Sequence, residues 1–143
     1  MDVMREIFFY GLFMDDTRLR ASGLSPIVIG PAVLDGYALV IEGRATLAAE
    51  IGSRSYGVVM ALSNEEAQSL YCEASVADYK PEQVTVKLLE TESLRECWCY
   101  NLPETRPATP PNESYRAELS QLLTQLGFPA EYVREVSGSS PAA

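Results

Sequence analysis

The chain has 143 residues, 47% of them hydrophobic, with a formal net charge of −9 and a pI near 4.5. A chain of this length and apolar content can bury its own core, and we expect one domain over residues 1–136 followed by a disordered tail over residues 137–143. The acidic balance disfavours nucleic acid and anionic membrane surfaces as partners, and the absence of histidine excludes Ser-His-Asp catalysis, Cys-His catalysis and most zinc sites.

The sequence predicts where the protein is located and whether its cysteines form disulfides. No stretch approaches the length of an apolar membrane span, and the first residues mix charges instead of forming a signal peptide. We therefore expect a cytoplasmic protein. Its three cysteines, Cys72, Cys97 and Cys99, form no disulfide framework. Cys97 and Cys99 are expected to be core or semi-buried residues of a strand, since no further ligands for a metal accompany them.

The N-terminal segment predicts a strand, a turn and a helix. Residues 6–10 are mostly apolar and indicate a buried strand, which ends at Gly11. Asp15 or Asp16 can cap a short helix that runs to about Ala21. Backbone amides in such a turn can bind an anion, although a buried strand that simply ends in a turn is the alternative interpretation.

Several short strands are predicted next. Residues 27–34 form an extended segment bent at Gly30-Pro31, and Asp35-Gly36 is a tight-turn signal that leads into a third strand over residues 37–41. Residues 45–48 are a short extended piece before Gly52. Residues 56–62 form a continuous apolar strand, in which Gly57 permits close approach of another backbone.

The second half combines helices and strands. Ser63 and Glu66 form a capping box that opens a helix ending near Cys72. The segments that follow are a loop over 73–79, strands over 83–89 and 95–102, a proline-rich surface connector over 103–111, an amphipathic helix from about 112 to 126 and a last helical turn over 129–133. The pattern predicts an α+β fold, a small mixed and partly closed β-barrel with two to three flanking helices.

Glu73 is the carboxylate with the strongest case for chemistry. It follows an apolar helix end, whereas the other acidic residues lie mainly in surface contexts. Burial would raise the pKa of such a carboxylate and suit it to general acid/base catalysis, although a solvated carboxylate at a helix end is equally compatible with the pattern. Cys72 has no histidine to activate it and is expected to be a structural thiol. Tyr10, Tyr79 and Tyr100 could offer hydroxyl groups to a pocket or serve only in packing.

The order and spacing of these segments resemble the gamma-glutamylcyclotransferase-like (AIG2-like) family over nearly the whole chain. The family's Tyr-Gly turn corresponds to Tyr10-Gly11, its catalytic glutamate falls on Glu73, and the tyrosine that follows falls on Tyr79. Further similar segments are residues 28–39, 45–47, 57–63 and 126–133.

The resemblance implies an enzyme that releases 5-oxoproline and a free amine from a γ-glutamyl amide, an activity that belongs to glutathione metabolism. Backbone amides of the turn would hold the substrate's α-carboxylate, and Glu73 would be the general acid/base. The implied substrate-binding residues are Tyr10, Gly11, Leu12, Phe13 and Tyr79, to which the hydroxyl argument adds Tyr100. The resemblance implies neither a metal nor a cofactor. Its only implied partner is the small γ-glutamyl substrate, and we expect a monomer or weak homodimer.

Two departures from the family pattern keep a second function open. Leu12-Phe13-Met14 stands where the family often has Ser-Asn-Leu or Thr-Leu, and Ala74 follows Glu73 where glycine is common. The alternative is a non-catalytic domain on the same fold that binds a small molecule or a protein.

Overall fold

The computed structural model describes residues 4–41, 45–71, 79–101 and 113–137, with the backbone alone at residues 71 and 137. Within these ranges lie five strands, a 3-10 helix and four α-helices. In chain order they are β1 (Met4–Phe9), the 3-10 helix η1 (Leu12–Met14), α1 (Asp16–Ala21), β2 (Ile27–Ile41), β3 (Ala45–Ser63), α2 (Asn64–Tyr71), β4 (Lys80–Leu88), β5 (Leu94–Asn101), α3 (Glu113–Gln125) and α4 (Ala130–Ser137).

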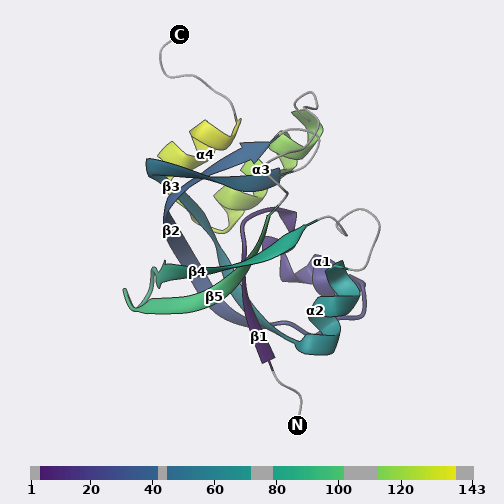
Figure 1. Ribbon diagram of the computed structural model, residues 1–143. Helices are drawn as coiled ribbons and strands as arrows, with labels where there is room; N and C mark the ends of the chain where they lie inside the picture. Colours follow the sequence, from purple (N-terminus) through teal and green to yellow (C-terminus); the bar gives the residue numbers. More distant parts are fainter. Residues whose placement is uncertain (1–3, 42–44, 72–78, 102–112, 138–143) are drawn as a thin grey trace.

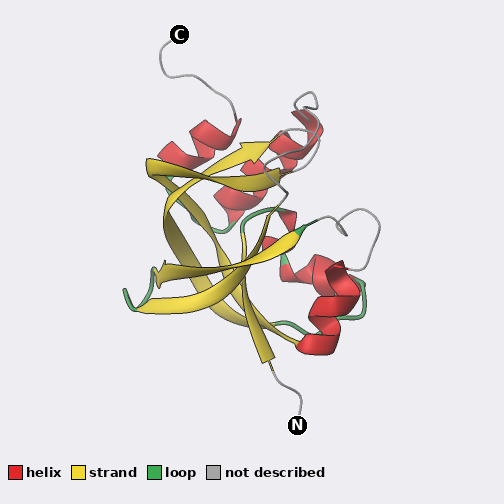
Figure 2. Ribbon diagram, in the orientation of Figure 1, coloured by secondary structure: helices red, strands yellow, loops and turns green. Residues whose placement is uncertain are grey.

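The five strands close into a barrel in the order β1-β3-β2-β4-β5 (Figure 1). Every pairing is antiparallel except that of β1 with β5, which is parallel at Ile7 and Trp98. The α+β barrel predicted from the sequence is confirmed. Figure 2 shows the helices outside the barrel. The described residues hold one α-helix more than the two to three predicted, because the last helical turn continues to Ser137 as α4.

Strands β2 and β3 form a hairpin much longer than the sequence indicated. The predicted tight turn at Asp35-Gly36 is wrong, because β2 runs through it and its pairing with β3 shifts register between Asp35 and Tyr37. Gly36, which has φ +87°, lies between the Asp35–Arg54 and Tyr37–Ala49 pairs and stands opposite residues 50–53, so the extra residues of this bulge are on β3. The break predicted between residues 48 and 56 is likewise wrong, since β3 continues through Gly52.

At Gly57 the backbone of β3 comes close to Phe8 and Phe9 of β1. A Cβ atom at this position would lie 2.2 Å from the Phe9 carbonyl oxygen and 2.9 Å from the Phe8 ring. No side chain fits at such distances, so this close approach requires glycine. The prediction of close backbone approach at Gly57 is confirmed.

The predicted helix caps are present. The Asp15 carboxylate accepts a hydrogen bond from the Thr17 amide at the start of α1. At the start of α2, the Ser63 hydroxyl accepts from the Glu66 amide, and the Glu66 carboxylate accepts from the Ser63 amide at 3.0 Å. These bonds satisfy backbone donors that a helix start leaves without partners.

The core fills the barrel and extends under the helices. Cys97 and Cys99 are buried as predicted, and burial raises the pKa of the Cys97 thiol to about 12. None of the helices in the described ranges has the length and hydropathy to cross a membrane. Cys72 and the predicted loop over 73–78, connector over 103–111 and tail from 138 onward lie outside the described residues.

Candidate functional site

Tyr10 fixes the turn that follows β1 to the end of β5. Its side chain is buried, and its hydroxyl donates a hydrogen bond to the Tyr100 carbonyl oxygen at 2.7 Å. Because β1 and β5 run parallel, their last residues meet at the same end of the barrel. The turn at residues 10–13 therefore lies at that end.

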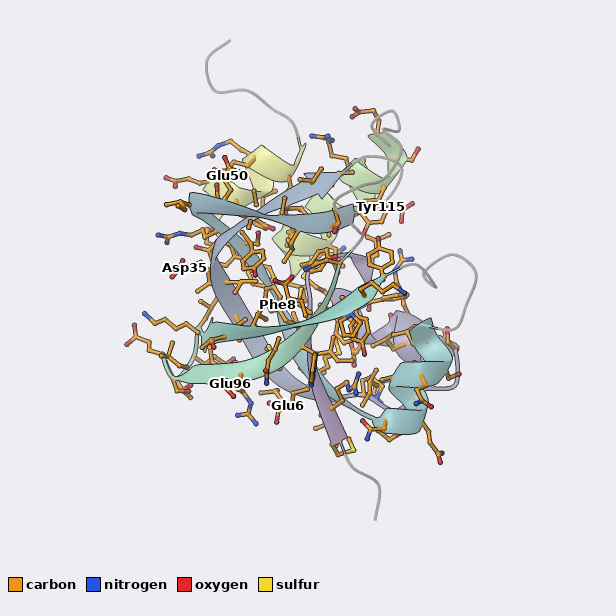
Figure 3. The ribbon with its side chains drawn as sticks, in the orientation of Figure 1. Glu6, Phe8, Asp35, Glu50, Glu96 and Tyr115 are labelled. Atoms are coloured by element: carbon orange, nitrogen blue, oxygen red, sulfur yellow. The ribbon has the colours of Figure 1, made fainter. Side chains whose placement is uncertain are left out.

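Gly11 is packed under a tyrosine from the other end of the sequence. A Cβ atom on Gly11 would lie 2.4 Å from the hydroxyl oxygen of Tyr115, which comes from α3. The Leu12 amide donates to the same oxygen at 3.3 Å. Figure 3 labels the Tyr115 side chain. Burial raises the pKa of Tyr115, and the hydrogen bond from Leu12 partly opposes the rise. The phenol therefore stays neutral at physiological pH.

The apolar side chains of the turn pack toward the core. Phe13 is partly buried and meets the Phe9 ring edge-on, with ring centroids 6.2 Å apart. Met14 is buried, and its amide closes the turn by donating to the Gly11 carbonyl at 3.0 Å. Recognition of a ligand by this turn therefore falls to its backbone groups.

Tyr79 lies at the same end of the barrel. It precedes β4, whose first residue, Lys80, pairs with Asn101 at the end of β5. The Tyr79 hydroxyl donates to the Ala45 carbonyl oxygen. The structure thus brings Tyr10, Tyr79 and the turn at Gly11 to one end of the barrel. We call Tyr10–Phe13, Tyr79 and Asn101 the barrel-end site.

Tyr100 and Glu73 are the remaining predicted site residues. Tyr100 contributes its carbonyl oxygen to Tyr10, whereas its hydroxyl accepts a hydrogen bond from the Arg5 guanidinium at 2.6 Å. Glu73 lies outside the described residues. Its role as general acid/base stays a prediction.

A polar cluster beside this site was missed from the sequence. The Glu82 carboxylate accepts hydrogen bonds from the Tyr37 hydroxyl at 2.7 Å and from the Asn101 side-chain amide at 3.1 Å. The Asn101 side-chain oxygen accepts from the Leu47 amide at 3.3 Å. The hydrogen bond to Glu82 raises the pKa of Tyr37 to about 12, since ionising the phenol would place two anions side by side.

Strand parity is the signal that could have revealed this cluster. Glu82 has the same parity as Val84, the first of the buried residues of β4, and Asn101 has the same parity as Cys99. Both polar residues therefore have the parity of the buried residues of their strand, with Asn101 buried and Glu82 exposed near the start of β4. No group of three or more acidic or cysteine side chains within the described ranges is placed to hold a metal ion.

The fold has close counterparts among solved structures. A gamma-glutamyl cyclotransferase superimposes with a TM-score of 0.81 at 20% identity, over 97% of this chain and 89% of that one. An uncharacterized human protein gives 0.81 at 20% identity, over 96% and 89%. A yeast gamma-glutamyl cyclotransferase specific to glutathione gives 0.64 at 14% identity, over 94% of each chain. At these identities the likeness defines the class of fold, that of gamma-glutamyl cyclotransferases.

Sequence comparison defines the family. A model described as the AIG2-like family matches residues 54–136, which is more than half of the chain. The chain therefore belongs to the AIG2-like family. No curated protein matches the chain significantly.

Proposed function

We propose that the protein is a gamma-glutamylcyclotransferase-type enzyme that converts a γ-glutamyl amide into 5-oxoproline and a free amine. The observation that carries the proposal is the glycine turn after β1, held at the barrel end beside Tyr10 and Tyr79 in a chain of the AIG2-like family. The cyclotransferase fold of its structural neighbours supports it. The protein would act in the cytoplasm without metal or cofactor.

The reaction is an intramolecular aminolysis that needs one residue able to accept and return a proton. The lone pair of the substrate's neutral α-amino group would attack the γ-carbonyl carbon, and the Glu73 carboxylate would accept the one proton that this nitrogen then loses. The tetrahedral intermediate then loses its amide nitrogen, which takes the proton back from the Glu73 carboxyl group. Nucleophile and electrophile belong to one molecule, so holding the chain in a bent conformation supplies much of the rate.

The turn at Gly11 would hold the substrate's α-carboxylate. The Leu12 amide donates to a neutral hydroxyl at 3.3 Å, which is long for such a bond. A carboxylate is a stronger acceptor, so it could take this donor in place of Tyr115. In this account Tyr115 keeps the amide in place until substrate arrives.

A panel of γ-glutamyl amino acids and γ-glutamyl amines tests the reaction, with 5-oxoproline as the measured product. At least one unblocked substrate should yield 5-oxoproline and amine in equal amounts. The N-acetyl form of that substrate is the matched control, because its blocked nitrogen cannot attack. Product from the N-acetyl form, or none from any substrate, would contradict the proposal.

The second candidate function is a non-catalytic binding domain. It is favoured by the same Leu12–Tyr115 hydrogen bond, which already occupies one amide of the turn, and by the apolar Phe13. The panel separates the two functions. Calorimetric binding of a γ-glutamyl compound without release of 5-oxoproline would support the binding domain.

A further inference from the structure

The bulge in the β2–β3 hairpin separates two parts of that hairpin. At the bulge, Gly36 of β2 stands opposite residues 50–53 of β3. Gly36 has φ +87° and Gly52 has φ +89°, angles that glycine adopts without steric cost, so each strand carries a residue suited to a hinge. Beyond the bulge, residues 37–41 pair with residues 45–49, and we call these two segments the arm. Figure 1 shows the hairpin bending where the arm begins.

The arm contacts two of the residues that define the barrel-end site. The Leu47 amide donates a hydrogen bond to the Asn101 side-chain oxygen at 3.3 Å. The Ala45 carbonyl oxygen accepts one from the Tyr79 hydroxyl. Ile41, Ala45 and Leu47 are all buried, so the arm is closed over this end of the barrel.

Side chains join the arm to the neighbouring strands β4 and β5. The backbone of β2 pairs with β4 at Ala32 and Val33, which lie on the other side of the bulge from the arm. On the arm, the Tyr37 hydroxyl donates to one oxygen of Glu82 at 2.7 Å, and Asn101 donates to the other at 3.1 Å. Glu82 is exposed, so water can replace both bonds when they break. The arm can therefore separate from β4 and β5 without disrupting a backbone ladder.

A cavity of about 710 Å³ lies between the arm and helix α4. Ala38, Leu39 and Ile41 line it from the arm, and Glu131 and Val136 line it from α4. The arm passes between α4 and the β4–β5 pair (Figure 1). A movement into the cavity would therefore carry the arm away from the barrel-end site, and the cavity provides the room for it.

We propose that the arm is a lid over the barrel-end site, hinged at Gly36 and Gly52 and held shut by the Glu82 carboxylate. Opening breaks the bonds from Tyr37 to Glu82 and from Leu47 to Asn101, while the strand pairs on the other side of the bulge stay formed. Substrate entry beneath the open lid rests on the proposed function, whereas the opening itself does not.

Hydrogen exchange of single amides, followed by NMR on the full chain without ligand, tests the opening. The reporter is the Leu47 amide, because its acceptor is the Asn101 side chain and the bond breaks when the lid opens. Although Leu47 is buried, its amide should exchange at least about tenfold faster than the slowest amides of residues 58–62, which lie in the β1–β3 ladder. A Leu47 amide that exchanges as slowly as those would overturn the proposal, since the arm would then open only when the whole molecule unfolds.

Variants of the clasp assign the opening to Glu82. Glu82→Ala removes the acceptor of two hydrogen bonds at an exposed position, so the Leu47 amide should exchange about tenfold faster than in wild type. Tyr37→Phe removes one of the two bonds and should have a smaller effect in the same direction. Glu96→Ala, at an exposed position on β5, is the matched control and should stay within about twofold of wild type. Exchange in Glu82→Ala no faster than in Glu96→Ala, with both folds verified by thermal melts, would refute the clasp.

The same measurement with 5-oxoproline, the product of the proposed reaction, tests whether the lid covers the ligand. At about ten times its dissociation constant, 5-oxoproline should slow exchange of the Leu47 amide about tenfold, because the lid must stay closed over it. Protection of the Leu12 amide without protection of Leu47 would overturn the lid's role at the site. Protection of neither amide would count against the proposed function, whereas the opening is decided by the exchange measured without ligand.

Discussion

At the scale of single residues, Gly11 is constrained by a contact and not by its backbone angles. Its φ of −109° is open to any residue, but a Cβ atom would lie 2.4 Å from the Tyr115 hydroxyl oxygen and 3.8 Å from the ring carbon that bears it. The first distance is a clash and the second is an ordinary contact. Removing the hydroxyl should therefore make room for a methyl group.

This geometry predicts a rescue. Gly11→Ala alone should lower the free energy of unfolding by about 1–3 kcal/mol through overpacking. Tyr115→Phe alone should lower it by about 1 kcal/mol, because the Leu12 amide loses its acceptor. The double variant should lose less free energy of unfolding than the two single variants lose together. In a double-mutant cycle from urea unfolding, the difference should be about 1 kcal/mol or more. Strict additivity would show that the hydroxyl is not what excludes a side chain at Gly11.

The Tyr37–Glu82 hydrogen bond predicts a loss of stability in alkali. The folded-state pKa of Tyr37 is raised to about 12, above the unfolded value near 10. The raised pKa therefore contributes stability that is complete below pH 10 and is lost as the pH rises through about 12. Urea unfolding should show wild type about 1 kcal/mol more stable than Tyr37→Phe at pH 8, with the difference shrinking by pH 11. A stability difference between wild type and Tyr37→Phe that stays constant from pH 8 to pH 11 would contradict the Tyr37–Glu82 hydrogen bond.

At the scale of elements, the start of α2 depends on one carboxylate. Glu66 accepts from the Ser63 amide at 3.0 Å and from the Ser25 amide at 2.6 Å. These bonds lower the pKa of Glu66 from its ordinary value of 4.5. A lowered folded-state pKa gives stability that is present above about 4.5 and is lost as the pH falls below it.

Glu66→Gln should therefore destabilise the protein by about 1 kcal/mol at pH 7, and less as the pH falls below 4.5. Glu65→Gln, in the same exposed turn, is the matched control and should change stability by less than about 0.5 kcal/mol. Thermal melts from pH 3.5 to pH 7 measure both. An effect of Glu66→Gln that is no larger than that of Glu65→Gln would show that the cap contributes little.

The sequence was sufficient to predict the type of most elements, because strand alternation, caps and glycine stops are local signals. It was insufficient for β2, since Asp35-Gly36 suits both a hairpin turn and a bulge. Only the continued pairing with β3 on both sides of Gly36 decides between them. Gly52 is ambiguous in the same way, because a glycine can end a strand or lie within one, and β3 continues through it.

The candidate site could be predicted only in part, because only some of its residues are close together in the chain. The turn at Tyr10-Gly11 was found because a strand, a glycine and a helix cap follow one another in the chain. Tyr115 was missed because it is 103 residues from Leu12, and the Asn101–Glu82 pair because it depends on the register in which β4 pairs with β5. The sequence of a single strand does not give that register.

At the scale of the whole molecule, the net charge of −9 disfavours self-association. Like-charged copies repel, so the chain should sediment as a 15.7 kDa monomer at low micromolar concentration and ordinary salt, with at most weak dimerisation at higher concentration. Sedimentation equilibrium measures this directly. A dimer that persists at nanomolar concentration would contradict it and would call for a large interface.

The rate of 5-oxoproline release by Glu73→Gln tests the central claim most directly. Glutamine keeps the shape of the side chain and cannot accept the proton, so kcat should fall by about 10²–10⁴ relative to wild type on the best γ-glutamyl substrate. Glu113→Gln, at an exposed helix start, is the control and should stay within about twofold of wild type. A Glu73→Gln rate within tenfold of wild type would contradict the account.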